Sequence, residues 1–181
     1  MIDPSKSQVI FAGAASLSAC IACVYDLRER RIPNWLTGPL FLAGVLARAC
    51  AGNWKGLFEA LTAALFGGML FLMFYVAGGL GAGDVKLMGA CASIVGLSAL
   101  PTLLICTGIF GALLAVCVSL VRGVFKQSLK NTCEVLAHHR IHGLTPHPEI
   151  NLGSGTGIRL PFALPIAAGC LFTLATLVAH R

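Results

Sequence analysis

The sequence has few charged residues. Only 11% of its 181 residues are Asp, Glu, Lys or Arg, whereas about a quarter of the residues in an ordinary soluble domain are charged. Hydrophobic residues make up 57% of the chain. This composition excludes a soluble globular domain and predicts an integral membrane protein.

The beginning of the chain lacks the pattern of a cleavable signal peptide. No basic stretch precedes the first apolar run, and no small-residue cleavage site followed by a soluble domain comes after it. We therefore expect this run to remain in the protein as its first membrane span.

The cysteines do not form the framework of a small disulfide-rich protein. Six of the eight lie inside apolar runs, where a thiol behaves as a small hydrophobic group. Cys20 and Cys23 form a C-x-x-C pair, but we expect no redox role for a pair inside a membrane span.

A polar loop carries several potential metal ligands: Cys133, His138, His139, His142 and His147. Their spacing resembles that of some metal sites, yet no second compact ligand pair accompanies them. We therefore expect solvated histidines, and no metal or other cofactor.

Six apolar segments are predicted to be membrane-spanning helices, which need about 20 residues, although 32–47 and 86–98 are shorter. Arg48 is expected to extend the short second segment by snorkelling to the interface, and Asn53, Trp54 and Lys55 predict an interfacial turn. The segments are 7–25, 32–47, 60–83 (including a glycine-rich turn), 86–98, 101–121 and 160–179. The predicted fold is an all-α, polytopic membrane protein with about six transmembrane helices and a single membrane-embedded domain, 1–181.

The long polar loop at about 122–159 begins with an amphipathic pattern. Hydrophobic residues recur at the spacing of one helix face, and charged residues stand between them. This pattern predicts an amphipathic helix on the membrane surface. The residues concerned are Phe125, Lys126, Leu129, Lys130, Glu134 and Leu136.

The basic residues predict the orientation. Nine of the thirteen Lys and Arg residues fall on one side of the predicted bundle, and the positive-inside rule assigns that side to the cytoplasm. These nine are Arg28, Arg30, Arg31, Lys86, Arg122, Lys126, Lys130, Arg140 and Arg159. The net charge of +6 is thus explained by basic cytoplasmic loops, and no nucleic-acid partner is inferred.

Two aspartates stand at the ends of predicted spans on this cytoplasmic side. Asp26 ends the first span, and Asp84 follows the glycine-rich turn GGLGAGDVK at 78–86. Ionisable groups at membrane depth are costly and mark functional sites. Two neighbouring carboxyl groups cannot readily both ionise, so they share a proton and can supply an acid and a base for hydrolysis of a peptide bond.

The glycines before Asp84 can shape the site in two ways. Glycine adopts backbone angles that other residues avoid, and it leaves bare backbone that an extended substrate can approach. Gly81 and Gly83 are therefore expected to shape the site. No serine or cysteine triad competes with the two carboxylates.

These motifs resemble the type IV prepilin peptidases, membrane aspartic proteases with an Asp at the end of an early helix and a later GxGD. The matching residues are Asp26; Ile32, Pro33 and Asn34; Gly81, Ala82, Gly83, Asp84, Val85 and Lys86; and, more weakly, Leu160, Pro161 and Phe162. The small size and the missing methyltransferase region with paired C-x-x-C motifs make the chain similar to the short peptidases of tight-adherence (Flp) pilus systems.

The resemblance implies catalytic Asp26 and Asp84, with Lys86, the two glycines and the I-P-N segment at 32–34 shaping the site. It implies a location in the bacterial inner membrane and substrates that are prepilins or pseudopilins, cut after a glycine at the cytoplasmic face. Membrane lipid is an expected partner, and pilus assembly machinery is a further candidate partner.

Two other functions share some of these features. Presenilin-like and signal-peptide-peptidase-like proteases also use a GxGD, but they have more spans and lack the I-P-N context. A small proton- or cation-coupled transporter could use two membrane aspartates, but it would hold them in a midplane cavity.

Overall fold

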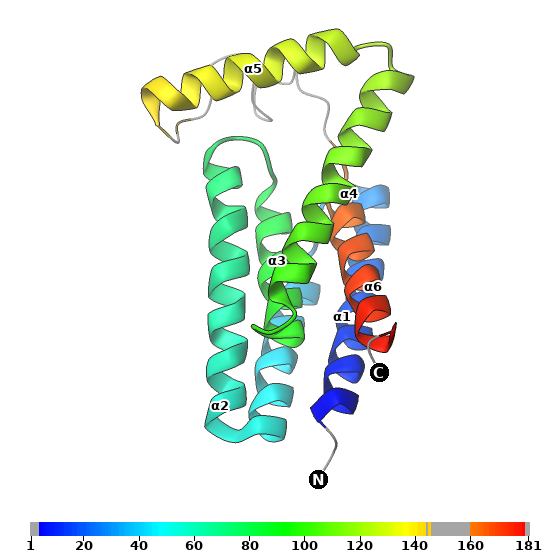
Figure 1. The fold of residues 1–181 in the computed structure, drawn as a ribbon, viewed down its shortest axis with the longest axis vertical. Coiled ribbons are helices and arrows are strands. Elements are labelled where there is room, and N and C mark those ends of the chain that lie inside the picture. Colours follow the sequence, from blue (N-terminus) through cyan, green and yellow to red (C-terminus); the bar gives the residue numbers. More distant parts are fainter. Residues whose placement is uncertain (1–3, 144, 146–159, 180–181) are drawn as a thin grey trace.

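The computed structural model describes residues 4–143, 145 and 160–179. Within these residues the chain forms six helices and no strand (Figure 1). The helices are α1 (Pro4–Glu29), α2 (Asn34–Val76), α3 (Ala82–Val95), α4 (Leu100–Val121), α5 (Phe125–His142) and α6 (Ala163–Ala179). The prediction of an all-α fold is confirmed.

The long helix α2 consists of two antiparallel legs. Asn53 has φ 53° and ψ −139°, which interrupts the helix at the predicted interfacial turn, and the chain doubles back there (Figure 1). The predicted second and third segments are therefore these two legs. Each leg runs further toward the turn than the apolar runs 32–47 and 60–83 indicated, because helical hydrogen bonding continues into polar residues.

Three helical segments are long and apolar enough to cross a membrane: Ser7–Glu29, Asn34–Val76 and Leu100–Val121. Helix α6 is a shorter apolar helix. Large hydrophobic side chains lie exposed on the outer faces, among them Leu46, Phe66, Ile105 and Leu113. The protein is therefore a multi-pass membrane protein whose apolar exterior faces lipid.

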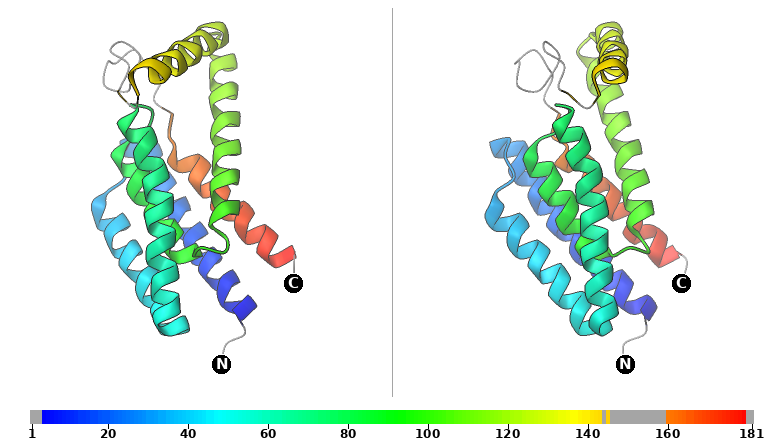
Figure 2. Two further views of the ribbon diagram at one scale, coloured as in Figure 1. Left: turned by 60° about the vertical axis from the view of Figure 1, so that its left-hand side comes forward. Right: turned by 90° about the vertical axis from the view of Figure 1, so that its left-hand side faces the viewer.

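Helix α1 contributes small residues to the core. Ala12, Ala15, Ala19 and Ala22 are all fully buried, and small side chains allow membrane helices to approach closely. Helix α3 packs mainly against α2 and also against α1, while α6 packs against both α1 and α4 (Figure 2). This packing surrounds the short α3, about 21 Å long at 1.5 Å per residue, with longer helices.

Arg48 was expected to snorkel to the interface, but its side chain is buried in the bundle. Its side chain is only 5% exposed; Nε donates a hydrogen bond to the Ile94 carbonyl oxygen at 2.8 Å, and a terminal nitrogen donates to the carbonyl oxygen of Val95. Nη1 also lies 2.9 Å from a Glu59 carboxylate oxygen. The prediction was wrong because the carbonyl groups at the end of α3 need donors, which Arg48 supplies.

Candidate active site

A cleft of about 500 Å³ opens at the end of the bundle where α1 ends and α3 begins. Asp26 and Asp84 both line it. The other lining residues are Leu27, Arg30, Tyr75, Leu80, Gly81, Arg122, Leu160 and Pro161. The structure thus brings together two carboxyl groups that lie 58 positions apart in the sequence.

Asp26 lies in the last turn of α1 and is partly buried. The helix was expected to stop at residue 25, but it continues to Glu29, and the Arg30 N–H still donates to the Asp26 carbonyl oxygen at 2.9 Å. The backbone N–H of Ala163, at the start of α6, lies near enough to the Asp26 carboxylate to stabilise its charge. The first and last helices of the bundle therefore meet at this side chain.

Asp84 lies in the first turn of α3, which begins at Ala82 and not at residue 86 as expected. Its side chain is 9% exposed, and Oδ2 accepts a hydrogen bond from the Gly81 N–H at 3.1 Å. A carboxylate in the first helical turn satisfies an unpaired N–H and faces the positive end of the helix dipole. These interactions hold the Asp84 carboxylate at the cleft that Asp26 also lines.

Gly81 and Gly83 leave room for neighbouring groups. The structure does not use them for unusual backbone angles. Gly81 is extended, with φ −87° and ψ 151°, so the expectation of a special backbone angle is wrong at this position; the positive φ in the turn belongs to Gly78. A Cβ at position 81 would lie 3.2 Å from Asp84 Oδ2, and one at position 83 would lie 3.1 Å from Ile32 Cβ. Both glycines allow neighbouring groups to approach α3 closely.

The I-P-N segment contacts α3 on a different side from the cleft. Pro33 is extended and precedes the first turn of α2, and the Lys86 ammonium group donates a hydrogen bond to Asn34 Oδ1 at 2.9 Å. Lys86 and Asn34 line a separate pocket of about 580 Å³ between α2 and α3. These residues join the two helices and do not line the cleft that holds the aspartates.

Sequence reasoning missed three polar residues of the cleft: Arg30, Tyr75 and Arg122. Each lies within one or two residues of the end of an apolar helix on the same side of the bundle as Asp26. That shared position was a signal that could have identified them.

The described part of the chain holds no group of three or more His, Cys, Asp or Glu residues arranged to bind a metal ion. His138, His139 and His142 belong to α5, whereas His147 lies outside the described residues. The helix predicted for the start of the polar loop is confirmed by α5, and its place on the membrane surface stays a prediction.

A sequence profile of the type IV leader peptidase family matches residues 14–116. The chain belongs to this family. The matched part contains both Asp26 and Asp84 together with the I-P-N segment, so the resemblance to prepilin peptidases is confirmed. No curated protein and no solved structure gives a significant match.

Membership of the type IV leader peptidase family makes the protein a peptidase embedded in the membrane. The matched segment ends at residue 116, before Arg122, α5 and α6. Residues beyond the matched segment nevertheless complete the cleft, because Arg122, at the end of α4, and Leu160 and Pro161, just before α6, line it.

Proposed function

We propose that Asp26 and Asp84 are the catalytic pair of an aspartic endopeptidase that removes the leader peptide of type IV prepilins or pseudopilins. The observation that carries this proposal is the shared cleft, into which α1 and α3 each contribute one carboxyl group. A peptidase also needs space for an extended peptide segment, and the cleft's volume of about 500 Å³ supports this requirement.

The chemistry needs one proton shared between the two carboxyl groups. The ionised group takes a proton from a water molecule, and the protonated group polarises the scissile carbonyl and then supplies a proton to the departing amine. The Gly81 N–H group donates a hydrogen bond to Asp84 and orients this side chain before substrate arrives, while the Ala163 N–H group lies next to the Asp26 carboxylate. Arg30 and Arg122 line the same cleft and bring positive charge to it.

We further propose that the cleft faces the cytoplasm from the bacterial inner membrane. Arg28, Arg30, Arg31, Lys86 and Arg122 all lie at or next to the cleft end of their helices. A concentration of basic residues on one side of a multi-pass protein is typical of the cytoplasmic side, which supports this orientation.

The proposed substrate is a precursor of a tight-adherence (Flp) pilin or pseudopilin, cut after a glycine. This part of the proposal rests on the resemblance to the short prepilin peptidases. In this proposal the chain is a single membrane-embedded domain with a cytoplasmic loop at about 122–159, and the reaction needs no metal or other cofactor.

The decisive experiment incubates the purified protein in detergent with candidate precursor pilins and maps the products by mass spectrometry. We expect one cut directly after the junction glycine, in the presence of EDTA and of serine- and thiol-directed inhibitors. The Asp84→Asn protein, purified in parallel, controls for contaminating proteases. Cleavage that persists in this variant, or that requires zinc, would contradict the proposal.

A further inference from the structure

Helix α5 stands apart from the rest of the bundle. It runs across the cleft end of the molecule after a sharp bend from α4 (Figure 1). Among the described helices, α4 is the only one with which it makes contacts. Its position is therefore not explained by packing against α1, α2, α3 or α6.

Helix α4 brings α5 to the level of the membrane surface. α4 is one of the segments able to cross the membrane, and its last residue, Val121, is 88% exposed. Only residues 122–124 separate the two helices, and three residues span at most about 10 Å. Phe125 thus begins α5 close to the boundary between hydrocarbon and headgroups.

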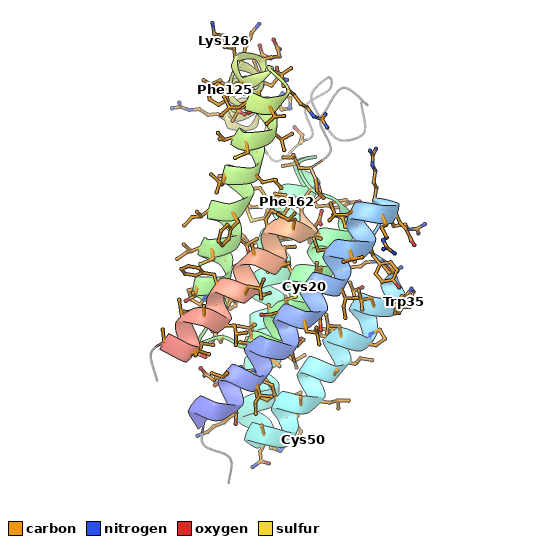
Figure 3. All side chains as sticks on the ribbon, turned by 90° about the vertical axis from the view of Figure 1, so that its right-hand side faces the viewer. Cys20, Trp35, Cys50, Phe125, Lys126 and Phe162 are labelled. Carbon is orange, nitrogen blue, oxygen red and sulfur yellow. The ribbon has the colours of Figure 1, made fainter. Side chains whose placement is uncertain are left out.

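The two sides of α5 differ in the way an interfacial helix requires. Phe125 and Leu129 are exposed hydrophobic residues four positions apart, so they share one face. Lys126 and Lys130 follow each of them by one position, which puts their charges at the border of that face. In Figure 3, Phe125 lies nearer the bundle than Lys126, which points outward at the end of the molecule.

We propose that α5 is a lipid-binding element that lies in the headgroup layer and binds anionic phospholipids through Lys126, Lys130 and Arg140. These three side chains are exposed, and basic groups on an amphipathic helix next to a membrane span are attracted to anionic lipid. This inference does not depend on the peptidase activity.

The alternative is that α5 covers the α2–α3 turn as a lid over the cleft. The contacts of α5 favour binding to the membrane over a role as a lid. Leu129 is 57% exposed, and α5 makes no contact with α2 or α3 within the described residues. A lid would bury this hydrophobic face against the turn.

The test places a tryptophan on each side of α5 in the full-length protein, with Trp35 and Trp54 replaced by Phe. Leu129→Trp reports the apolar face, and Gln127→Trp reports the opposite face, since residues two apart on a helix point in nearly opposite directions. Both proteins are reconstituted in vesicles of phosphatidylcholine with or without phosphatidylglycerol, and quenching by brominated lipid is measured.

We expect brominated lipid to quench the fluorescence of the Leu129→Trp protein several-fold more than that of the Gln127→Trp protein, and more strongly when phosphatidylglycerol is present. Equal quenching of the two proteins, or no effect of the anionic lipid, would overturn the proposal. Protection of the Leu129→Trp protein from both brominated lipid and aqueous iodide would show a lid instead. If the tryptophan replacements prevent folding, hydrogen exchange of the wild-type protein gives the same answer: amides of α5 should exchange more slowly in the anionic membrane.

A charge variant separates specific attraction from simple proximity. Lys126→Gln should lower the equilibrium constant for binding of α5 to the anionic membrane roughly 5-fold, which is the effect of one basic residue near an anionic surface. Lys55→Gln removes the same charge beside the turn of α2 at the opposite end of the bundle and should leave this constant unchanged. Equal effects of the two substitutions would refute headgroup binding by α5.

Discussion

Ile32 packs directly against Gly83, at a distance that accommodates a side chain on the glycine only if Ile32 shifts by a few tenths of an ångström. A Cβ at position 83 would lie 3.1 Å from Ile32 Cβ, and Ile32 itself is buried. This contact joins the segment that follows α1 to the first turn of α3. It therefore links the element that carries Asp26 to the element that carries Asp84.

The first prediction concerns this contact. Gly83→Ala should push Ile32 and the start of α3 apart by a few tenths of an ångström and lower kcat roughly 10-fold, because small misplacements of reacting groups slow catalysis strongly. Gly38→Ala is the matched control, since nothing lies within 4 Å of a Cβ at that helical position. Steady-state cleavage of a precursor pilin measures both, and equal, wild-type rates would show that the contact does not position the site.

A second prediction concerns Gly81. Its backbone angles suit alanine, so Gly81→Ala should fold normally, but the new Cβ 3.2 Å from Asp84 Oδ2 should displace the carboxylate. We expect kcat to fall roughly 10- to 100-fold while the melting temperature stays the same. In Gly79→Ala, in the same turn, the Cβ would make only an ordinary 3.5 Å contact with the Phe74 carbonyl oxygen; if this control loses as much activity, the carboxylate is not the cause.

The third prediction tests the two carboxyl groups as one unit. Asp26→Asn and Asp84→Asn should each lower kcat by roughly 10²- to 10⁴-fold, the usual contribution of general acid–base catalysis. The double variant should be little worse than either single one, because groups that act together are not additive. Glu29→Gln, one helical turn from Asp26 and exposed, should retain full activity. Substantial turnover by either aspartate variant would remove that residue from the mechanism.

A fourth prediction concerns Arg48, which closes the far end of α3. Arg48→Ala leaves the carbonyl groups of Ile94 and Val95 without their side-chain donor, at a cost of about 2–4 kcal/mol in the free energy of unfolding. The melting temperature in detergent should fall by roughly 5–15 °C. Glu59→Gln should cost less than about 1 kcal/mol, because the Glu59 side chain is half exposed. A melting temperature unchanged by Arg48→Ala would show that these hydrogen bonds contribute little.

The sequence predicted the apolar helices α1, α2, α4 and α6 because hydropathy reports which segments can lie in lipid. It located the turn at Asn53 and the amphipathic α5, and the family motifs identified the two aspartates that the cleft brings together. Helix ends were less well predicted: α1 continues to Glu29 and α3 begins at Ala82. Hydropathy marks where polar residues begin, whereas backbone hydrogen bonds decide where a helix ends.

Contacts between distant segments were not predictable from local pattern. Arg48 lies 46 positions before the Ile94 carbonyl group that it binds, so its sequence neighbours indicated only an interfacial cation. For Arg122 and Tyr75 the sequence shows a position at the end of an apolar helix on the side of Asp26, but the cleft that they line exists only once the helices have packed together.

The last prediction concerns how the substrate is recognised. A precursor pilin should arrive as a short basic leader, a glycine and a hydrophobic helix, which is the pattern that the family resemblance implies. The hydrophobic helix remains in lipid beside the bundle, where burial of apolar surface stabilises it by about 0.8 kcal/mol per CH₂ group, while the leader stays in water. Only the junction between them then reaches the cleft lined by Asp26 and Asp84.

Hydrolysis requires an extended peptide at this junction, and glycine lowers the cost of leaving the helix by about 1 kcal/mol relative to alanine. Replacing the junction glycine by valine should therefore block cleavage far more than neutralising the leader charges does. Moving the glycine one helical turn into the hydrophobic segment, about 5.4 Å deeper, should also abolish cleavage, since the cleft opens at the end of the bundle. Mass spectrometry of the products distinguishes these substrates. Efficient cleavage of the valine substrate, or of the one with the shifted glycine, would contradict recognition at the membrane edge.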